Sequence, residues 1–295
     1  MNLKVIGVDF SCAPKKNKPI VVSIGRLTIA YSKLKVKPSS YVSLDTLIVL
    51  ESLHEFEKFL SRSKNWVGGF DLPFGMPRAL VENFHWPVSW SKFAKFYCSE
   101  ERNYLRSCFK AWCDDRPVGK KYAWRQTDMV AKSSSAMRWT NPPVAWMMHA
   151  GLMRMLDQDL IFPAHNYPVS ASKIYNDLIK KNNNKKPFKI ALEAYPALTA
   201  RLVTKKSYKS DDKNKQNSER LGFRKAILQG LINDEVGLDL TLLITRKMSG
   251  VLLEDGKGDY LDSTICMLQA SSSILKKNFG FSKDVDPLEG WIICS

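Results

Sequence analysis

The stretch Lys4-Val5-Ile6-Gly7-Val8-Asp9-Phe10-Ser11 decides how we interpret the rest of the chain. Its apolar residues, interrupted only by Gly7, are typical of a short buried strand that ends at Asp9 and Ser11. A carboxylate at the end of a buried strand is costly to bury unless a metal ion, a basic partner or backbone N–H groups compensate its charge. Asp9 is therefore the first candidate for a functional residue.

Three later stretches repeat this pattern of apolar residues that end in an acid. They are Trp66-Val67-Gly68-Gly69-Phe70-Asp71, Phe188-Lys189-Ile190-Ala191-Leu192-Glu193, and a helix-like segment that opens Gly258-Asp259-Tyr260-Leu261-Asp262. One such acid would mean little. Four stretches whose acids meet at one edge of a sheet indicate a site for a metal ion.

Composition bounds the class of protein and its partners. The chain has 295 residues, of which 44% are hydrophobic and 25% charged, enough for one large α/β domain with insertions or for two small ones. We expect one domain over residues 1–295. The formal charge of +16 favours polyanionic partners, with nucleic acid first and an anionic membrane surface second. The alternative is a charge that merely keeps the surface soluble.

Other global signals point to a cytoplasmic protein without a membrane partner. No stretch approaches the roughly 20 apolar residues of a membrane span, and the chain opens directly in a strand rather than in a signal peptide. The six cysteines form no C-x-x-C pair, so we expect free thiols in a reducing compartment. The oligomeric state stays open.

The first half of the chain predicts a sheet with one confident helix. After a lysine-rich turn at 14–19, strands are expected at 20–24 and 27–31, joined tightly at Gly25-Arg26 into an antiparallel meander with the first strand. A helix over 52–61 begins with a capping box, Ser52 with Glu55. A fourth strand over 66–70 ends in the turn at 71–77, and the polar loop at 182–187 leads into a fifth strand that ends at Glu193.

Between the fourth and fifth strands we expect a helical cap, residues 82–165. It holds six of the eight tryptophans, which favours either a surface for stacking bases or, for any single Trp, the cap's own core; the core is the favoured interpretation. From the cap, Arg125, Lys132 and Arg138 are candidates for phosphate contacts.

The second half predicts helices around a mobile lysine-rich loop. Helices are expected over 197–203, 221–232, 238–245 and from 259 to about 277, and the loop over 204–218. Its residues Lys205, Lys206 and Lys209 either steer a phosphate backbone or are simply solvated.

Asp259 and Asp262 lie three residues apart, so they share one face of the last helix. Asp259 is either a functional acid or a helix cap, whereas Asp262 borders the face that must pack on the sheet and is placed to reach Asp9. Carboxylates without histidine or cysteine suit Mg²⁺, and two such ions about 4 Å apart can stabilise the attacking and leaving oxygens of phosphodiester hydrolysis. The four histidines lack metal-ligand spacing, and neither a nucleophile elbow nor a Walker A loop is present in the sequence.

Several motifs together resemble domain-of-unknown-function family 429, which is described as predicted ribonuclease-H-like nucleases. They are Gly7-Val8-Asp9, Phe70-Asp71-Leu72-Pro73-Phe74-Gly75, Leu192-Glu193-Ala194-Tyr195-Pro196-Ala197, Gly258-Asp259-Tyr260-Leu261-Asp262-Ser263 and Glu289-Gly290-Trp291-Ile292. The resemblance runs from residue 3 to Ile292 and implies an α/β fold with a ribonuclease-H-like mixed five-stranded sheet, three antiparallel strands and then two parallel ones.

The acidic pair in the last helix also resembles that of RuvC-type Holliday-junction resolvases. This resemblance implies that Asp9, Asp71, Asp259 and Asp262 hold Mg²⁺ or Mn²⁺, with Glu193 as a fifth, auxiliary acid. The leading hypothesis is thus a metal-dependent nuclease acting on DNA or RNA. The alternatives are a nucleic-acid-binding module of the same fold without catalysis and, third, an ATP-using enzyme of the actin and sugar-kinase superfamily, for which a second phosphate loop is missing from the sequence.

Overall fold

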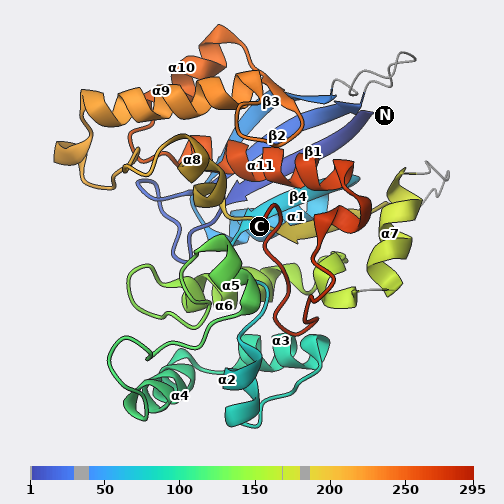
Figure 1. Ribbon diagram of the computed structural model, residues 1–295, viewed down its shortest axis with the longest axis vertical. Coiled ribbons are helices and arrows are strands. Elements are labelled where there is room, and N and C mark those ends of the chain that lie inside the picture. The colour runs from blue at the N-terminus through green and yellow to red at the C-terminus, as the bar shows by residue number, and fades with distance from the viewer. Residues whose placement is uncertain (1, 30–39, 168, 180–186) are drawn as a thin grey trace.

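The computed structural model describes residues 2–29, 40–167, 169–179 and 187–295. Within them, a six-stranded mixed sheet with the strand order β5-β4-β1-β2-β3-β6 is flanked by helices (Figure 1). The strands are β1 (Asn2–Asp9), β2 (Ile20–Ile29), β3 (Ser40–Leu50), β4 (Trp66–Asp71), β5 (Lys189–Glu193) and β6 (Thr241–Leu243). The expected α/β class with a mixed sheet is confirmed.

Strand β1 lies in the middle of the sheet, between an antiparallel and a parallel neighbour. It is antiparallel to β2, which is antiparallel to β3, and it is parallel to β4, which is parallel to β5. The sixth strand departs from the expected five. We predicted a helix over 238–245, but Thr241–Leu243 pairs in parallel with Tyr41–Ser43 at the open edge of β3. A long-range backbone pairing here overrides the local helical pattern.

The interpretation of residues 20–31 as two short strands was wrong. A single strand, β2, continues through Gly25, where the pairing with β3 shifts its register between Ile24 and Gly25. Gly25 thus marks a bulge within a strand and not a turn between two strands. The third strand is β3 instead, and the end of the predicted one, residues 30 and 31, lies outside the described residues. So does most of the polar loop expected at 182–187, at its residues 182–186.

The helices fall into two groups, which Figure 1 separates. Those of the lower half follow β4, and the others pack around the sheet. The helices are α1 (Leu53–Arg62), α2 (Arg78–Asn83), α3 (Trp90–Ser99), α4 (Arg102–Asp114), α5 (Gln126–Ala131), α6 (Val144–Met155), α7 (Val169–Ile179), α8 (Pro196–Val203), α9 (Ser218–Asn233), α10 (Arg246–Glu254) and α11 (Asp259–Leu275), with 3₁₀ turns at Pro163–Asn166, Lys213–Lys215 and Lys277–Gly280. Among the helices of the described residues, none combines the length and the apolar character that crossing a membrane requires.

Several predicted helices are confirmed. The capping box of α1 is complete, because the Glu55 N–H donates to Ser52 Oγ at 3.1 Å and the Ser52 N–H donates to Glu55 Oε2 at 3.1 Å. Helices α8, α9 and α11 also form where their apolar periodicity predicts them, with ends that differ by a few residues.

Alternate residues of the central strands pack into two separate hydrophobic cores, one on each face of the sheet. Ile6 and Val8 of β1 pack on the side of α1 and the helices that follow β4, whereas Val5 packs on the side of α8 to α11. Because residues i and i+2 of a strand share a face, Gly7 and Asp9 lie on the same side as Val5, that of α11.

Glycines let α11 lie directly on this face. Gly7 and Gly69 are register partners on β1 and β4. A Cβ at Gly7 would collide with the backbone of Ser263 and Met267, and one at Gly69 with the carbonyl of Cys266. This close approach brings the first turn of α11 next to the strand ends that carry the acids.

The tryptophans of the inserted helices mostly form a core. Trp86, Trp112 and Trp146 are buried in the same cluster as the residues of α3 and α6, which confirms the favoured interpretation for these three. Trp124 differs, since 44% of its surface is exposed.

Candidate functional site

The carboxyl ends of β1 and β4 bring two of the predicted acids together. Asp9 and Asp71 are the last register partners of these parallel strands. Both side chains are half-buried and line a cavity of about 460 Å³, which we call the acid-lined cavity. Its wall also includes Ser11, Lys18, Asn141, Lys209, Lys257 and Asp259.

Asp259, at the start of α11, faces the same cavity. It does not occupy the N-cap position, which is that of Gly258, and in the first turn the Tyr260 N–H donates to the Asp255 carboxylate at 3.0 Å. Asp255 therefore satisfies one of the free N–H groups of the helix start, and the Asp259 carboxylate lines the cavity.

Asp262 lies one turn further along α11 and is fully buried, with 0% of its surface exposed. The Tyr208 hydroxyl donates to Asp262 Oδ1 at 2.5 Å, and the Lys209 ammonium donates to Asp262 Oδ2. Both carboxylate oxygens therefore have a protein partner. The lysine that we expected in a mobile loop instead forms an ion pair with this buried carboxylate.

Burial and mutual repulsion disfavour the charged forms of these acids. Burial raises the pKa of Asp9 well above its usual range, and the carboxylates of Asp262, Asp259 and Asp71 raise it further, although Lys209 counteracts them. Burial in the same way raises the pKa of Asp71 to about 7 and that of Asp259 to about 6. Perturbed carboxyl groups gathered in one cavity are typical of functional sites.

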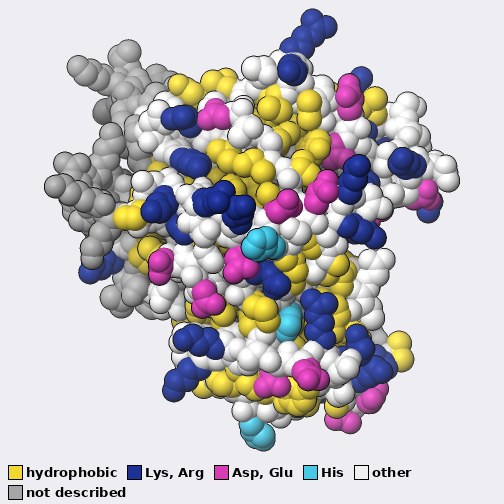
Figure 2. Space-filling model, turned by 180° about the vertical axis from the view of Figure 1, so that it is seen from behind, with side chains coloured by type: hydrophobic (Ala, Val, Ile, Leu, Met, Phe, Trp, Pro, Cys, Tyr) yellow, Lys and Arg dark blue, Asp and Glu magenta, His cyan; other side chains and the backbone are white. Residues whose placement is uncertain are grey.

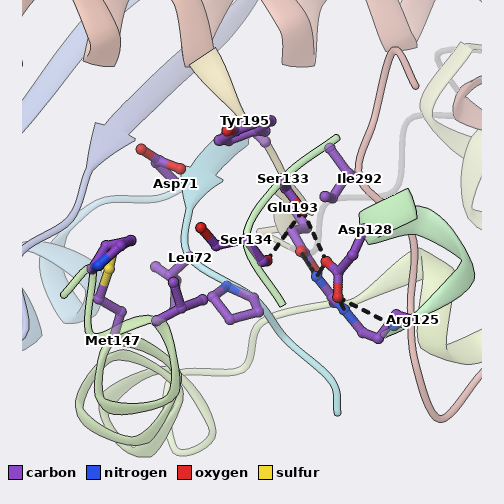
Figure 3. Close-up of a pocket in the computed structure, with 14 residues that line it drawn as sticks. Asp71, Leu72, Arg125, Asp128, Ser133, Ser134, Met147, Glu193, Tyr195 and Ile292 are labelled. Atoms are coloured by element: carbon purple, nitrogen blue, oxygen red, sulfur yellow. Dashed lines mark hydrogen bonds and ion pairs between the residues drawn. The ribbon is translucent and has the colours of Figure 1, made fainter. Parts of the chain in front are cut away.

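Glu193 does not join this cluster, and the register of the sheet explains why. Its partner on β4 is Phe70, not Asp71, so its side chain points to the opposite face of the sheet. There the carboxylate accepts from the Phe74 N–H at 3.1 Å and, in a bidentate ion pair, from Arg125 at 2.6 and 2.8 Å (Figure 3).

Arg125 is correspondingly a buried structural residue, with only 1% of its surface exposed. Besides Glu193, its guanidinium donates to both oxygens of Asp128, at 2.7 and 3.1 Å, and to the carbonyl of Glu289 at 3.0 Å. This geometry contradicts the expected phosphate contact, because the N–H groups of the guanidinium all donate to acceptors within the protein.

The C-terminal motif closes this buried network. The N–H groups of Arg78 and Gln126 donate to the Glu289 carboxylate at 2.8 and 3.1 Å, and the Ile292 N–H donates to Thr127 Oγ1 at 2.8 Å. The motif at 289–292 therefore holds the inserted helices against β5, and its role is structural.

A smaller inner cavity of about 170 Å³ lies on the other side of Asp71. Figure 3 shows Asp71 and Tyr195 at one end of it and the Arg125, Asp128 and Glu193 cluster at the other. Asp71, Pro142 and Met147 line both cavities, so Asp71 is shared between them.

Most of the other predicted cations lie away from the acids. None of Lys132, Arg138, Lys205 and Lys206 lines either cavity of the described residues. Lys132 is exposed after α5, and Lys206 pairs with Glu219 at 3.4 Å.

Lys18 and Lys257 line the acid-lined cavity, and neither was predicted from the sequence. Their sequence signals were the lysine-rich turn directly after the first acid and a lysine between two glycines next to Asp259. The excess of positive charge gives no further guide on the face seen in Figure 2, where Lys and Arg side chains are scattered among Asp and Glu.

One cysteine, Cys12, lines the acid-lined cavity beside Phe10 and Ser11. All six cysteines are free thiols, as expected, and no histidine lines the acid-lined cavity of the described chain. As the side chains stand, the described residues also contain no group of three His, Cys, Asp or Glu residues close enough to hold a metal ion.

Comparisons of the chain with protein-family models, with curated proteins and with solved structures find no match. The resemblance of its motifs to domain-of-unknown-function family 429 therefore stays a prediction. The protein's function has to be inferred from the site itself.

Proposed function

We propose that the protein is a divalent-metal-dependent hydrolase of phosphodiester bonds in nucleic acid, built on a ribonuclease-H-like fold. The observation that carries the proposal is the meeting of Asp9, Asp71 and Asp259 from three separate elements in one cavity. The order of three antiparallel strands, two parallel strands and a last acidic helix supports the fold, with β6 as an addition.

The chemistry of the donor set fits Mg²⁺ or Mn²⁺. Hard divalent cations take oxygen ligands, and the half-buried Asp9, Asp71 and Asp259 offer carboxylates to one space. Because the three do not yet converge within ligand distance, binding requires these side chains to turn into the cavity. A bound ion would stabilise the charge that develops on the phosphoryl oxygens and activate the attacking water.

Different residues of the chain would bind the metal ion and the substrate. Asp9, Asp71 and Asp259 would hold the cation, and Lys18 and Lys257 at the cavity wall would contact substrate phosphates. Such contacts are independent of sequence, so binding would depend on salt rather than on base identity. The six free thiols support a reducing compartment as the place of action.

A nucleic-acid-binding module without catalysis is the second candidate, and one observation favours it. Asp262, an expected metal ligand, already has both oxygens bonded to Tyr208 and Lys209. In that module the acids would serve only to hold α11 and the segment around Lys209 together.

A cleavage assay distinguishes the two candidates. End-labelled single-stranded, duplex and branched oligonucleotides of DNA and RNA are incubated with millimolar Mn²⁺, with Mg²⁺ or with a chelator. We expect metal-dependent cleavage by the wild type and by the control Asp157→Asn, whose acid is exposed and lies outside the cavity, but not by Asp71→Asn. Binding without cleavage in every condition would instead support the non-catalytic module.

Salt dependence tests which lysines contact phosphate. We expect Lys18→Gln/Lys257→Gln to reduce the slope of log affinity against log salt by roughly 1.4–1.8, the value for two lost phosphate contacts. The matched pair Lys205→Gln/Lys206→Gln should change it less, because neither side chain lines the cavity. Filter binding of a labelled oligonucleotide at several salt concentrations measures both slopes. A larger effect of the second pair would place the substrate over the 204–218 segment instead.

A further inference from the structure

The segment around Lys209 is held in place at each of its residues. The Tyr208 carbonyl accepts from Arg224 at 2.8 Å, the Lys209 carbonyl accepts from Ser207 Oγ at 2.9 Å, and the Ser210 N–H donates to the Gly256 carbonyl at 3.0 Å. Arg220 also donates to the Lys209 carbonyl. Lys209 is therefore a built-in part of the site and not a solvated loop residue.

The Lys209 side chain packs directly against Gly258. A Cβ at Gly258 would lie 2.9 Å from Lys209 Cβ and 3.1 Å from Cδ, and Gly258 has a φ of +77°. Only glycine leaves this space open and also adopts this conformation without strain. The aliphatic part of Lys209 crosses the start of α11 there and carries the ammonium to the Asp262 carboxylate.

The Lys209 ammonium lies where a positive charge offsets the mutual repulsion of the acids. Four carboxylates, Asp9, Asp71, Asp259 and Asp262, interact electrostatically in this site, and Lys209 acts on all of them as the opposing charge. Its side chain nevertheless keeps 41% of its surface exposed and lines the cavity, so the charge also faces the space a substrate would enter.

We propose that the Lys209 ammonium replaces one of the two cations of a two-metal site, so that the protein binds a single divalent ion at Asp9, Asp71 and Asp259. This inference rests on the proposed function, because it presupposes that the acids bind metal. Asp262 then positions Lys209 and is not a metal ligand. A fixed ammonium beside the ion would stabilise negative charge on the substrate without reorganisation.

The test is calorimetric titration with Mn²⁺ alone, together with melting in the presence of Mn²⁺ or of a chelator. We expect one ion per chain in the wild type. Lys209→Gln should bind Mn²⁺ about tenfold more tightly or take up a second ion, because an opposing positive charge is lost. Its melting temperature should fall in chelator and recover with Mn²⁺ more than that of the wild type. Lys209→Arg, which keeps the charge, should stay close to the wild type in stoichiometry.

A second variant covers the case in which Lys209→Gln does not fold. In Lys209→Gln/Asp262→Asn, both charges of the ion pair are removed, so no buried acid is left unpaired. We expect it to bind one Mn²⁺ with an affinity within a few-fold of the wild type. Loss of binding in this variant would show that Asp262 is a ligand and would overturn the inference.

Other outcomes separate this inference from the proposed function. Two ions per chain in the wild type, or unchanged Mn²⁺ affinity and stoichiometry in Lys209→Gln, would overturn the inference and leave metal-dependent hydrolysis standing. Binding in Lys209→Gln but not in the wild type would also overturn the inference, because the wild type would then have no single-ion site. No binding in any variant would overturn both.

Discussion

Replacing Arg125 by methionine is expected to lower the free energy of unfolding by about 3–5 kcal/mol, which is typical of breaking a buried ion pair from one side. Asp128 and Glu193 are both buried, and their four carboxylate oxygens accept hydrogen bonds from this one guanidinium. Methionine fills a similar volume but leaves two buried acids without their cation. Urea denaturation followed by tryptophan fluorescence measures the loss.

Two further variants show whether the charge is the cause. Glu193→Gln should destabilise less than Arg125→Met, because Arg125 keeps Asp128 as its partner. Arg62→Met, at an exposed arginine at the end of α1, should change the stability by less than about 0.5 kcal/mol. If Arg125→Met is within 1 kcal/mol of the wild type, the buried network contributes little to stability, and Arg125 is free for another role.

The acids of the cavity were predictable because the signal for each is local. An apolar strand that ends in a carboxylate is visible in a few residues, and Asp9 and Asp71 each follow such a run. Their meeting follows from the rule that neighbouring parallel strands present their carboxyl ends at the same edge. Asp259 and Asp262 were predicted from helical spacing alone.

The role of Glu193 was not predictable, because it depends on register. A shift of one residue moves a strand side chain to the other face of the sheet, and no local pattern shows that Glu193 pairs with Phe70 rather than with Asp71. Its partner Arg125 lies 68 residues away in the sequence. The ion pair of Lys209 with Asp262 spans 53 residues and was missed for the same reason.

The error in the third strand has a different cause. Gly25-Arg26 between two apolar runs has the composition of a tight turn, whereas the strand continues there through a bulge. Glycine serves both structures, so only the pairing of β2 with β1 and β3 decides between them. The consequence for the site is small, because β2 contributes none of the acids.

Replacing Asp9 by asparagine is expected to abolish metal-dependent hydrolysis. The cleavage rate should fall by about 10³-fold or more, which is typical when an enzyme loses a group that stabilises charge in the transition state. Asp9 belongs to the central strand and interacts electrostatically with Asp71, Asp259, Asp262 and Lys209. Asparagine keeps the shape of the side chain and removes its charge. Cleavage of a labelled oligonucleotide with Mn²⁺ measures the loss, and Asp157→Asn is the control.

The same substitution should keep or raise the stability of the fold at neutral pH. Burial raises the pKa of Asp9 in the folded state, with help from the neighbouring acids, so the folded protein holds this proton more tightly than the unfolded chain does. Ionising Asp9 therefore destabilises the fold progressively as the pH rises above the unfolded pKa of about 3.9 and through the higher folded pKa. Asparagine cannot ionise and so avoids this destabilisation. The free energy of unfolding of the variant should therefore exceed that of the wild type by an amount that grows with pH.

Activity and stability together decide what Asp9 does. A carboxylate retained only to anchor Lys209 would stabilise the fold, and its loss would lower the unfolding free energy along with any activity. A carboxylate retained for a cation destabilises the metal-free protein, because it adds charge to a buried acidic cluster. Lost cleavage with unchanged or greater stability in chelator would thus assign Asp9 to metal binding. Lost stability of more than about 1 kcal/mol would assign it to structure and contradict the proposed site.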